Sequence, residues 1–175
     1  VISLAVAWYV SVSRDTAPEW ALKAAPPGLT LLDADQAAAH YQAGAFQSVP
    51  GNSINRYQAD DLWLAVELPQ PVMLAPGSVL SVRPATLAHV EVYRLTHLGK
   101  PVPAGTAGLK VPREHWPMVA RGPTFVLDKS PEYSATVLVK VNARQFALAI
   151  VQVETAAEHH LASEQEVFLL GCVLS

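Results

Sequence analysis

Leu62-Trp-Leu-Ala-Val-Glu-Leu68 is the stretch that decides the fold of this 175-residue chain. Its even-numbered positions are all leucine or valine, whereas its odd-numbered positions are a tryptophan, an alanine and a glutamate. Because side chains alternate across a β-strand, the pattern predicts a strand with one apolar face and one mixed face. Pro69 and Pro71 cannot donate to a strand ladder, so we expect the strand to end there. A tryptophan beside a carboxylate suits a sugar-binding sheet, and it equally suits an ordinary half-covered sheet.

Other short apolar or alternating segments, separated by proline and glycine, predict further strands. We expect them at residues 79–83, 88–95, 124–127, 135–142 and 146–153, with the last two forming a hairpin. The intervening segments are predicted to be connections: an extended lead-in at residues 14–31, polar turns at 48–61, and a long proline- and glycine-rich passage at 96–123. Short strand character within that passage is expected near residues 109–111.

A short helix is predicted to begin after Asp33. The Asp33 carboxylate can accept from the free amide groups of the first turn, Gln36 can reach back, and Asp35 suits the positive end of the helix dipole. Gly44 is a suitable residue to follow the helix. Five or more strands with only one clear helix near the start indicate an all-β sandwich.

The composition excludes several classes of function. The formal net charge is -3 and no run of lysine or arginine occurs, which argues against nucleic acid as a partner. Cys172 is the only cysteine, so an internal disulfide is excluded and a thiolate metal site is not expected. Hydrophobic residues make up 51% of the chain and are concentrated at its two ends, which indicates a location next to a membrane.

Both ends are therefore interpreted as membrane-related segments. Residues 1–12 are apolar and uncharged but fewer than the ~20 that a spanning helix needs, so we expect residues 1–13 to be the end of a signal peptide or membrane anchor. Residues 156–175 are expected to be a linker helix and the start of a transmembrane helix. Residues 26–155 are then the sandwich domain. The alternatives are a buried strand or helix at the first end and a docked apolar helix at the second.

Catalytic and metal-binding motifs are scarce. The chain has no nucleophile motif, no glycine-rich phosphate loop and no His-Glu-x-x-His, so we expect neither catalytic residues nor a cofactor. His159 and His160 point about 100° apart on a helix and share a metal poorly, so no metal site is expected there. Asp60 and Asp61 could ligate calcium, but turn residues are the preferred interpretation.

Strict strand alternation places a set of polar and aromatic residues away from the core. These candidate ligand-binding residues are Trp63, Glu67, Arg83, His89, Glu91, Tyr93, Lys140 and Asn142. Such side chains can stack on a sugar ring and hydrogen-bond its hydroxyl groups. The alternative is that the two aromatic members pack under a loop or against the other sheet. Trp116, in the long connection, is a second candidate stacking residue and is expected to be exposed.

The chain resembles the type 2 extracellular sensor domain of bacterial seven-transmembrane receptors with diverse intracellular signalling modules (7TMR-DISM). The segments that carry the resemblance are Leu29-Thr-Leu-Leu-Asp33, the short helix followed by Phe46, Leu62-Trp-Leu64, Val90-Glu-Val-Tyr93, the loop of residues 105–112, Phe125-Val-Leu127, Val137-Leu-Val-Lys-Val141 and Phe168-Leu-Leu-Gly171. The last of these resembles the entry to the first membrane helix of the family. Ala65 departs from the family pattern, in which such strands often read Trp-Leu-Arg.

The resemblance implies a jelly-roll-like β-sandwich similar to carbohydrate-binding modules, with a C-terminal helix leading toward the membrane. Such a domain would lie on the periplasmic face of the bacterial inner membrane. It would sense a small-molecule or glycan ligand, or another periplasmic domain, and control a cytoplasmic histidine kinase or diguanylate cyclase. A homodimer is a further candidate assembly. The alternatives are a secreted carbohydrate-binding module attached to an enzyme and, third, a glycoside hydrolase that uses Glu67 and Glu91.

Overall fold

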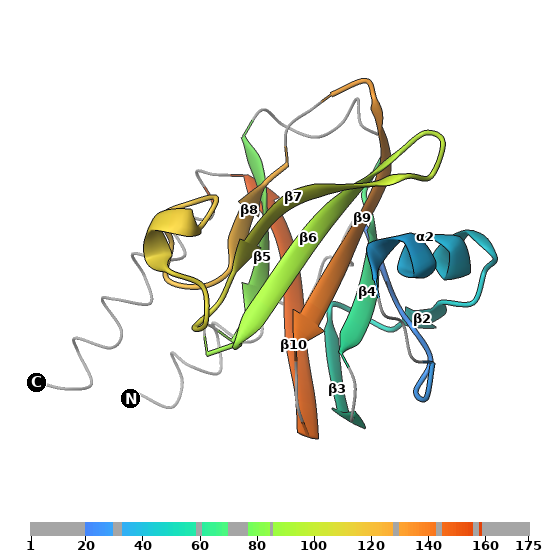
Figure 1. Ribbon diagram of the computed structural model, residues 1–175, viewed down its shortest axis with the longest axis horizontal. Coiled ribbons are helices and arrows are strands. Elements are labelled where there is room, and N and C mark those ends of the chain that lie inside the picture. Colours follow the sequence, from blue (N-terminus) through green and yellow to red (C-terminus); the bar gives the residue numbers. More distant parts are fainter. Residues whose placement is uncertain are drawn as a thin grey trace, which may run out of the picture.

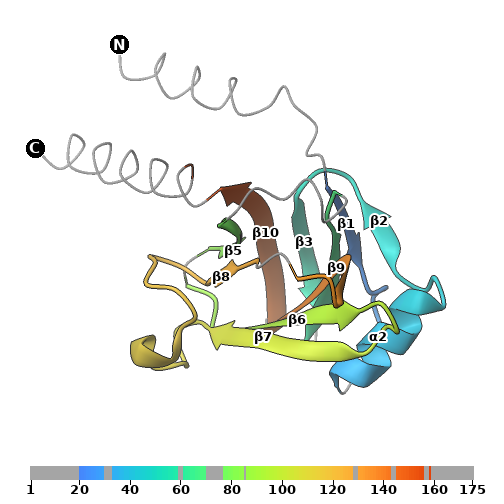
Figure 2. The ribbon, with the colours of Figure 1, turned by 90° about the horizontal axis from the view of Figure 1, so that it is seen from above.

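In the part of the chain that the structure describes, ten strands form two antiparallel sheets that pack face to face (Figure 1 and Figure 2). The computed structural model describes residues 20–29, 33–58, 61–69, 77–84, 86–127, 130–142, 145–155 and 158. Sheet A contains, in spatial order, β2 (Gln47–Val49), β1 (Ala21–Ala24), β4 (Leu62–Glu67), β9 (Tyr133–Asn142), β6 (His89–Thr96) and β7 (Pro101–Ala107). Sheet B contains β3 (Ser53–Gln58), β10 (Gln145–Thr155), β5 (Ser78–Arg83) and β8 (Thr124–Val126). The prediction of an all-β sandwich is therefore confirmed.

The core lies between the sheets and is built by the alternation seen in the sequence. Leu62, Leu64 and Val66 of β4 point inward and have no exposed surface. They meet inward valines of β9 and β6 in sheet A, and leucine, valine and phenylalanine side chains of β5, β10 and β8 in sheet B. Full burial of one such side chain contributes about 1.5–3 kcal/mol relative to leaving it in water. β4 is also buried on its other face, where Trp63 and Ala65 belong to a second cluster.

The short helix is α2 (Ala34–Gln42), and its predicted start is confirmed. The Asp33 carboxylate accepts a hydrogen bond from the Gln36 amide at 2.9 Å. Gly44 follows the helix at a φ of 75°, a left-handed conformation that favours glycine. The helix covers part of the outer face of sheet A, where Ala37 and Ala38 pack in one cluster with Trp63 (Figure 1).

The hairpin predicted for residues 135–142 and 146–153 is wrong. β9 pairs with β4 and β6 in sheet A, whereas β10 pairs with β3 and β5 in sheet B. Each of the two strands is long and apolar enough to occupy an interior position of its own sheet, so the chain passes from one sheet to the other between them.

The connections also contain strands that the sequence patterns did not predict. β7 occupies Pro101–Ala107, where a proline- and glycine-rich connection was expected, because an edge strand tolerates proline on its unpaired side. The strand character expected at residues 109–111 is absent, since this part of the chain forms turns. β1, β2 and β3 lie in segments predicted to be lead-in and turns, and each is short or at a sheet edge.

Several predictions fall on residues outside those described. These are the membrane-related interpretations of residues 1–13 and of almost all of 156–175, and the positions Asp60, His159, His160 and Cys172. Among the residues that the structure does describe, no helix combines the length and the apolar character needed to cross a membrane.

Candidate functional site

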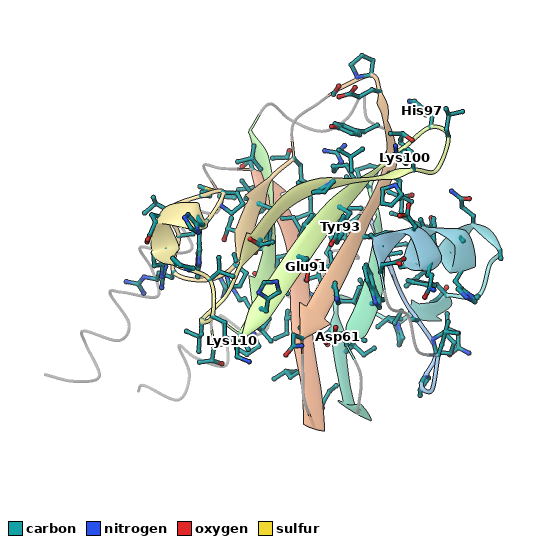
Figure 3. The ribbon with its side chains drawn as sticks, viewed as in Figure 1. Asp61, Glu91, Tyr93, His97, Lys100 and Lys110 are labelled. Atoms are coloured by element: carbon teal, nitrogen blue, oxygen red, sulfur yellow. The ribbon has the colours of Figure 1, made fainter. Side chains whose placement is uncertain are left out.

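The outer face of sheet A is divided into a part under α2 and a part over which the described residues place no helix. The second part is centred on three neighbouring strands, β4, β9 and β6. Their register places Lys140 of β9 directly between Trp63 of β4 and Glu91 of β6. The adjoining positions on this face carry Tyr93 and His89 from β6 and Asn142 from β9, and Asp61 immediately precedes β4 (Figure 3).

Six of these side chains form a connected polar network, which we define as Asp61, His89, Glu91, Tyr93, Lys140 and Asn142. The Lys140 ammonium lies 3.1 Å from Asp61 Oδ2 and 3.7 Å from Glu91 Oε1. Asn142 donates from Nδ2 to Asp61 Oδ1 at 2.7 Å, and His89 Nε2 lies 3.2 Å from Glu91 Oε1. The network therefore joins the three strands through charged and hydrogen-bonded contacts.

Tyr93 connects the network to the aromatic layer beneath it. Its hydroxyl donates to Glu91 Oε2, and its ring centroid lies 6.0 Å from that of Trp63. Burial is the main cause that raises the pKa of Tyr93, and the hydrogen bond to Glu91 raises it further. The phenol consequently stays protonated at neutral pH and continues to donate to Glu91.

Trp63 lies beneath the polar network, and neither face of its ring is accessible to solvent. It is only 1% exposed, and the Lys140 ammonium lies 5.6 Å from its ring centroid. Ala37, Ala38 and Phe46 belong to the same buried cluster. The ring therefore has no surface left to stack on a sugar, and it packs with α2 on the outer face of sheet A rather than under a loop or against sheet B.

Two other candidates do not belong to this surface. Arg83 ends β5 in sheet B, where it pairs with Ile150, so the expectation that it shares a face with the other candidates is wrong. Trp116 was expected to be exposed, and this is also wrong. It is 8% exposed, its Nε1 donates to the Val111 carbonyl at 3.0 Å, and the Arg113 guanidinium lies 4.0 Å from its ring centroid. The loop buries the large apolar ring and satisfies its single donor.

Glu67 lies on the same face but belongs to a different cluster, next to α2. Its Oε1 accepts from Lys23 Nζ at 2.6 Å and from the Tyr41 hydroxyl at 2.6 Å. The same hydroxyl lies 3.2 Å from Thr136 Oγ1. Burial acts to raise the pKa of Glu67, but the hydrogen bonds from Lys23 and Tyr41 outweigh it, and the pKa lies below its usual value. The hydrogen bond to Glu67 is the main cause that raises the pKa of Lys23.

Four members of these clusters, namely Asp61, Tyr41, Lys23 and Thr136, were not among the predicted binding residues, although the first two left a signal. Asp61 continues the odd-numbered positions of the mixed face of β4, so the alternation could have placed it beside Trp63. Tyr41 follows Ala37 by one helical turn, so both lie on the face of α2 that meets the sheet. Lys23 lies on a four-residue strand whose pattern is too short to reveal a face.

The geometry does not support the pair Glu67 and Glu91 as hydrolytic carboxylates. Glu67 pairs with Thr136 and Glu91 pairs with Lys140, which places them two strands and four residues apart. Ordinary interstrand and per-residue spacings in a sheet place the Cα atoms of the two residues about 17 Å apart. Glycoside hydrolases hold their two carboxyl groups about 5 to 10 Å apart. In the described part of the chain, moreover, no three potential metal ligands are grouped.

Comparison with protein families identifies a related family. A protein-family model described as 7TMR-DISM extracellular 2 matches residues 9–155 of the chain. The match includes every strand of both sheets, α2, and all members of the polar network. No curated protein and no solved structure matches the chain.

Proposed function

This chain belongs to the family of 7TMR-DISM extracellular 2 domains, and we propose that it senses its ligand through the polar network on the outer face of sheet A. The family consists of non-catalytic sensor domains of membrane receptors, which lie on the periplasmic or extracellular side. Membership favours a receptor domain over a secreted binding module. The identity of the ligand and the nature of the output domain do not follow from family membership, and for these we make a proposal.

The observation that carries this proposal is the partial exposure of a satisfied polar network. The exposed fractions of the side chains are 18% for Lys140, 22% for Glu91, 28% for Asp61 and 33% for His89. These values mean that each group is held in place by its neighbours and still reaches solvent. The network offers ammonium and amide donors beside carboxylate acceptors, which is the combination that sugar hydroxyl groups require.

The ligand that fits this surface is a polyhydroxylated molecule such as a glycan. Because Trp63 and Trp116 are both buried, such a ligand would be held by hydrogen bonds and charge rather than by stacking on a tryptophan. Another periplasmic domain with a polar surface, or a second copy of this chain, would be the alternative partner. The polar groups of either partner would replace the contacts that Glu91 and Lys140 make within the network.

Signalling would follow from a difference in ligand affinity between two arrangements of the sandwich. A ligand that bridges Asp61, Glu91 and Lys140 would favour the arrangement in which β4, β9 and β6 keep their present register. The chain leads from β9 into β10, the last described strand, and from there toward the segment interpreted as membrane-related. The proposed output is a cytoplasmic histidine kinase or diguanylate cyclase.

The experiment is a titration of the 175-residue chain against a panel of neutral and acidic glycans by isothermal calorimetry. The variants are Glu91→Gln and Lys140→Met, each of which removes one charge from the network. Glu67→Gln is the matched control, since it removes a carboxylate from the same sheet face but outside the network. We expect the two network variants to lose at least about tenfold in affinity while the control binds as the wild type does. Equal binding by all four proteins would contradict the proposal.

A further inference from the structure

A pocket of about 430 Å³ opens at the end of the sandwich where β9 finishes and β6 begins. Its lining residues are Pro84, Thr86, Leu87, Ala88, Lys110, and Asn142 and Leu148 from the two sheets. Figure 3 shows Lys110 at this end, whereas His97 and Lys100 lie at the opposite end of the sandwich. The volume lies in the range of about 300–1,000 Å³ that is usual for small-molecule sites.

Backbone contacts fix the position of Lys110 at the border of this pocket. The amide of Leu109 donates to the Leu87 carbonyl at 2.9 Å, and the amide of Lys110 donates to the Ala88 carbonyl at 2.9 Å. Gly108 makes this approach feasible, because it has a φ of +125° and a Cβ at its position would lie 2.7 Å from the Ala88 oxygen. The backbone of Lys110 is therefore fixed to the segment of Leu87 and Ala88 that lines the pocket.

The lining combines an apolar wall with donors and a single positive charge. Leu87 is 8% exposed and belongs to the core, so the pocket reaches down to the apolar interior. Leu148 and Pro84 extend this apolar wall. The polar side chains of the lining are those of Thr86, Lys110 and Asn142, and none of the described lining residues carries a carboxylate.

Lys110 itself is not neutralised within the described part of the protein. The ion pairs found there join other residues, namely Lys23 with Glu67, His89 with Glu91, and Lys140 with Asp61 and Glu91. An ammonium group beside an apolar wall attracts an anion whose remaining surface is apolar. A cation would be repelled by Lys110, and a neutral polyol would leave the Leu87 and Leu148 surfaces unused.

We propose that this pocket binds a small amphipathic carboxylate, with its aliphatic part against Leu87 and Leu148 and its carboxylate at Lys110. The site is distinct from the polar network, although Asn142 borders both. It would give the receptor a second input, a short-chain fatty acid or the carboxylate of an apolar amino-acid derivative, which share this chemistry. A titration with hexanoate and with N-acetylleucine distinguishes these two sources.

The test uses the 175-residue chain labelled with ¹⁵N and follows amide resonances by NMR. Hexanoate is the first probe, and hexanamide is its neutral counterpart of equal chain length. We expect hexanoate to shift the amides of Thr86, Leu87, Lys110 and Leu148, and to bind at least about tenfold more tightly than hexanamide, since only the carboxylate pairs with an ammonium. This comparison in the wild-type protein does not depend on the folding of any variant.

Two lysine variants test the role of the charge. Lys110→Met should weaken hexanoate binding at least about tenfold, whereas Lys100→Met, at the opposite end of the sandwich, should leave it unchanged. Glu67→Gln, which lies outside both the pocket and the polar network, should also leave hexanoate binding unchanged. The proposal is overturned if hexanoate shifts none of the pocket amides, if hexanamide binds as well, or if Lys110→Met binds hexanoate as the wild type does.

Discussion

Glu67 and Glu91 lie on the same face of the same sheet, yet their surroundings differ in one respect. Glu67 lies next to α2 and is held by Lys23 and by Tyr41 of the helix. Glu91 lies where no described helix covers the sheet, and it is held by Tyr93, His89 and Lys140, which are themselves on the sheet. The contacts of Glu67 thus join the sheet to α2, whereas the described contacts of Glu91 join strands of the sheet to one another; the two side chains are similarly exposed, at 31% and 22%.

The largest expected effect comes from the residue beneath both regions. Trp63→Ala would remove a 1% exposed indole that packs with Ala37 and Phe46 on one side and Lys140 on the other. We expect a loss of about 3–5 kcal/mol in the free energy of unfolding, measured by chemical denaturation with a tryptophan-independent probe such as far-UV circular dichroism. A loss below about 1 kcal/mol would mean that the indole is a surface group. The part of the sheet next to α2 and the polar network would then not both pack on Trp63.

The next effect concerns the hydroxyl under the helix. Tyr41→Phe removes a donor to Glu67 and a contact with Thr136. We expect a loss of about 1–2 kcal/mol in the free energy of unfolding, because the partly buried carboxylate would lose a hydrogen bond that water replaces poorly. Tyr93→Phe is the matched substitution in the polar network. It should cost less, since Glu91 retains two charged or hydrogen-bonding partners, Lys140 and His89, whereas Glu67 retains only Lys23 among its described contacts. A larger loss for Tyr93→Phe would reverse the proposed difference between the two regions.

A pH dependence should distinguish the regions as well. The pKa of Glu67 is lower in the folded protein than in the unfolded chain, so its ionised form favours folding. This stabilisation is present above the unfolded pKa and is lost as the pH falls through the lowered folded pKa. Melting temperatures between pH 7 and pH 2 should therefore decline less steeply for Glu67→Gln than for the wild type. Parallel declines would show that the contacts with Lys23 and Tyr41 do not stabilise the ionised form.

The smallest effect on stability is expected for Glu91→Gln. A partly exposed ion pair contributes little, so we expect a change within about 1 kcal/mol in the free energy of unfolding. The measurement is the same denaturation experiment as for Trp63→Ala. A loss above about 2 kcal/mol would indicate that Glu91 is a structural residue like Glu67, and the polar network would then be a poor candidate for ligand exchange.

Sequence patterns predicted the parts of the fold in which local chemistry and tertiary structure agree. The alternation at residues 62–68, the cap at Asp33 and the strands at residues 79–83 and 88–95 all carry a complete local signal, and each is confirmed. The predictions failed where contacts with a neighbouring strand determine the local structure or the strand pairing. Pro101 and Pro103 mark a break locally, but an edge position in sheet A accommodates them in β7. The assignment of β9 and β10 to different sheets is likewise set by their partners.

The candidate site was predictable to a similar extent. Alternation correctly gathered Trp63, Glu67, His89, Glu91 and Tyr93 on one face, together with Lys140 and Asn142. It could not show that Trp63 is buried, because burial depends on α2 and on Lys140 lying over the ring. Nor could it show that Arg83 lies on the other sheet, since a period of two residues gives a face and not a sheet.

The central claim is that the uncovered part of sheet A binds the ligand and that the part next to α2 does not. It is tested most directly by NMR, with the ¹⁵N-labelled chain titrated with a glycan that binds in the calorimetric panel. The account predicts progressive shifts of the amides of His89, Glu91 and Lys140, and resonances of Lys23, Tyr41 and Glu67 that stay in place. Shifts confined to the second group, or confined to sheet B, would contradict it.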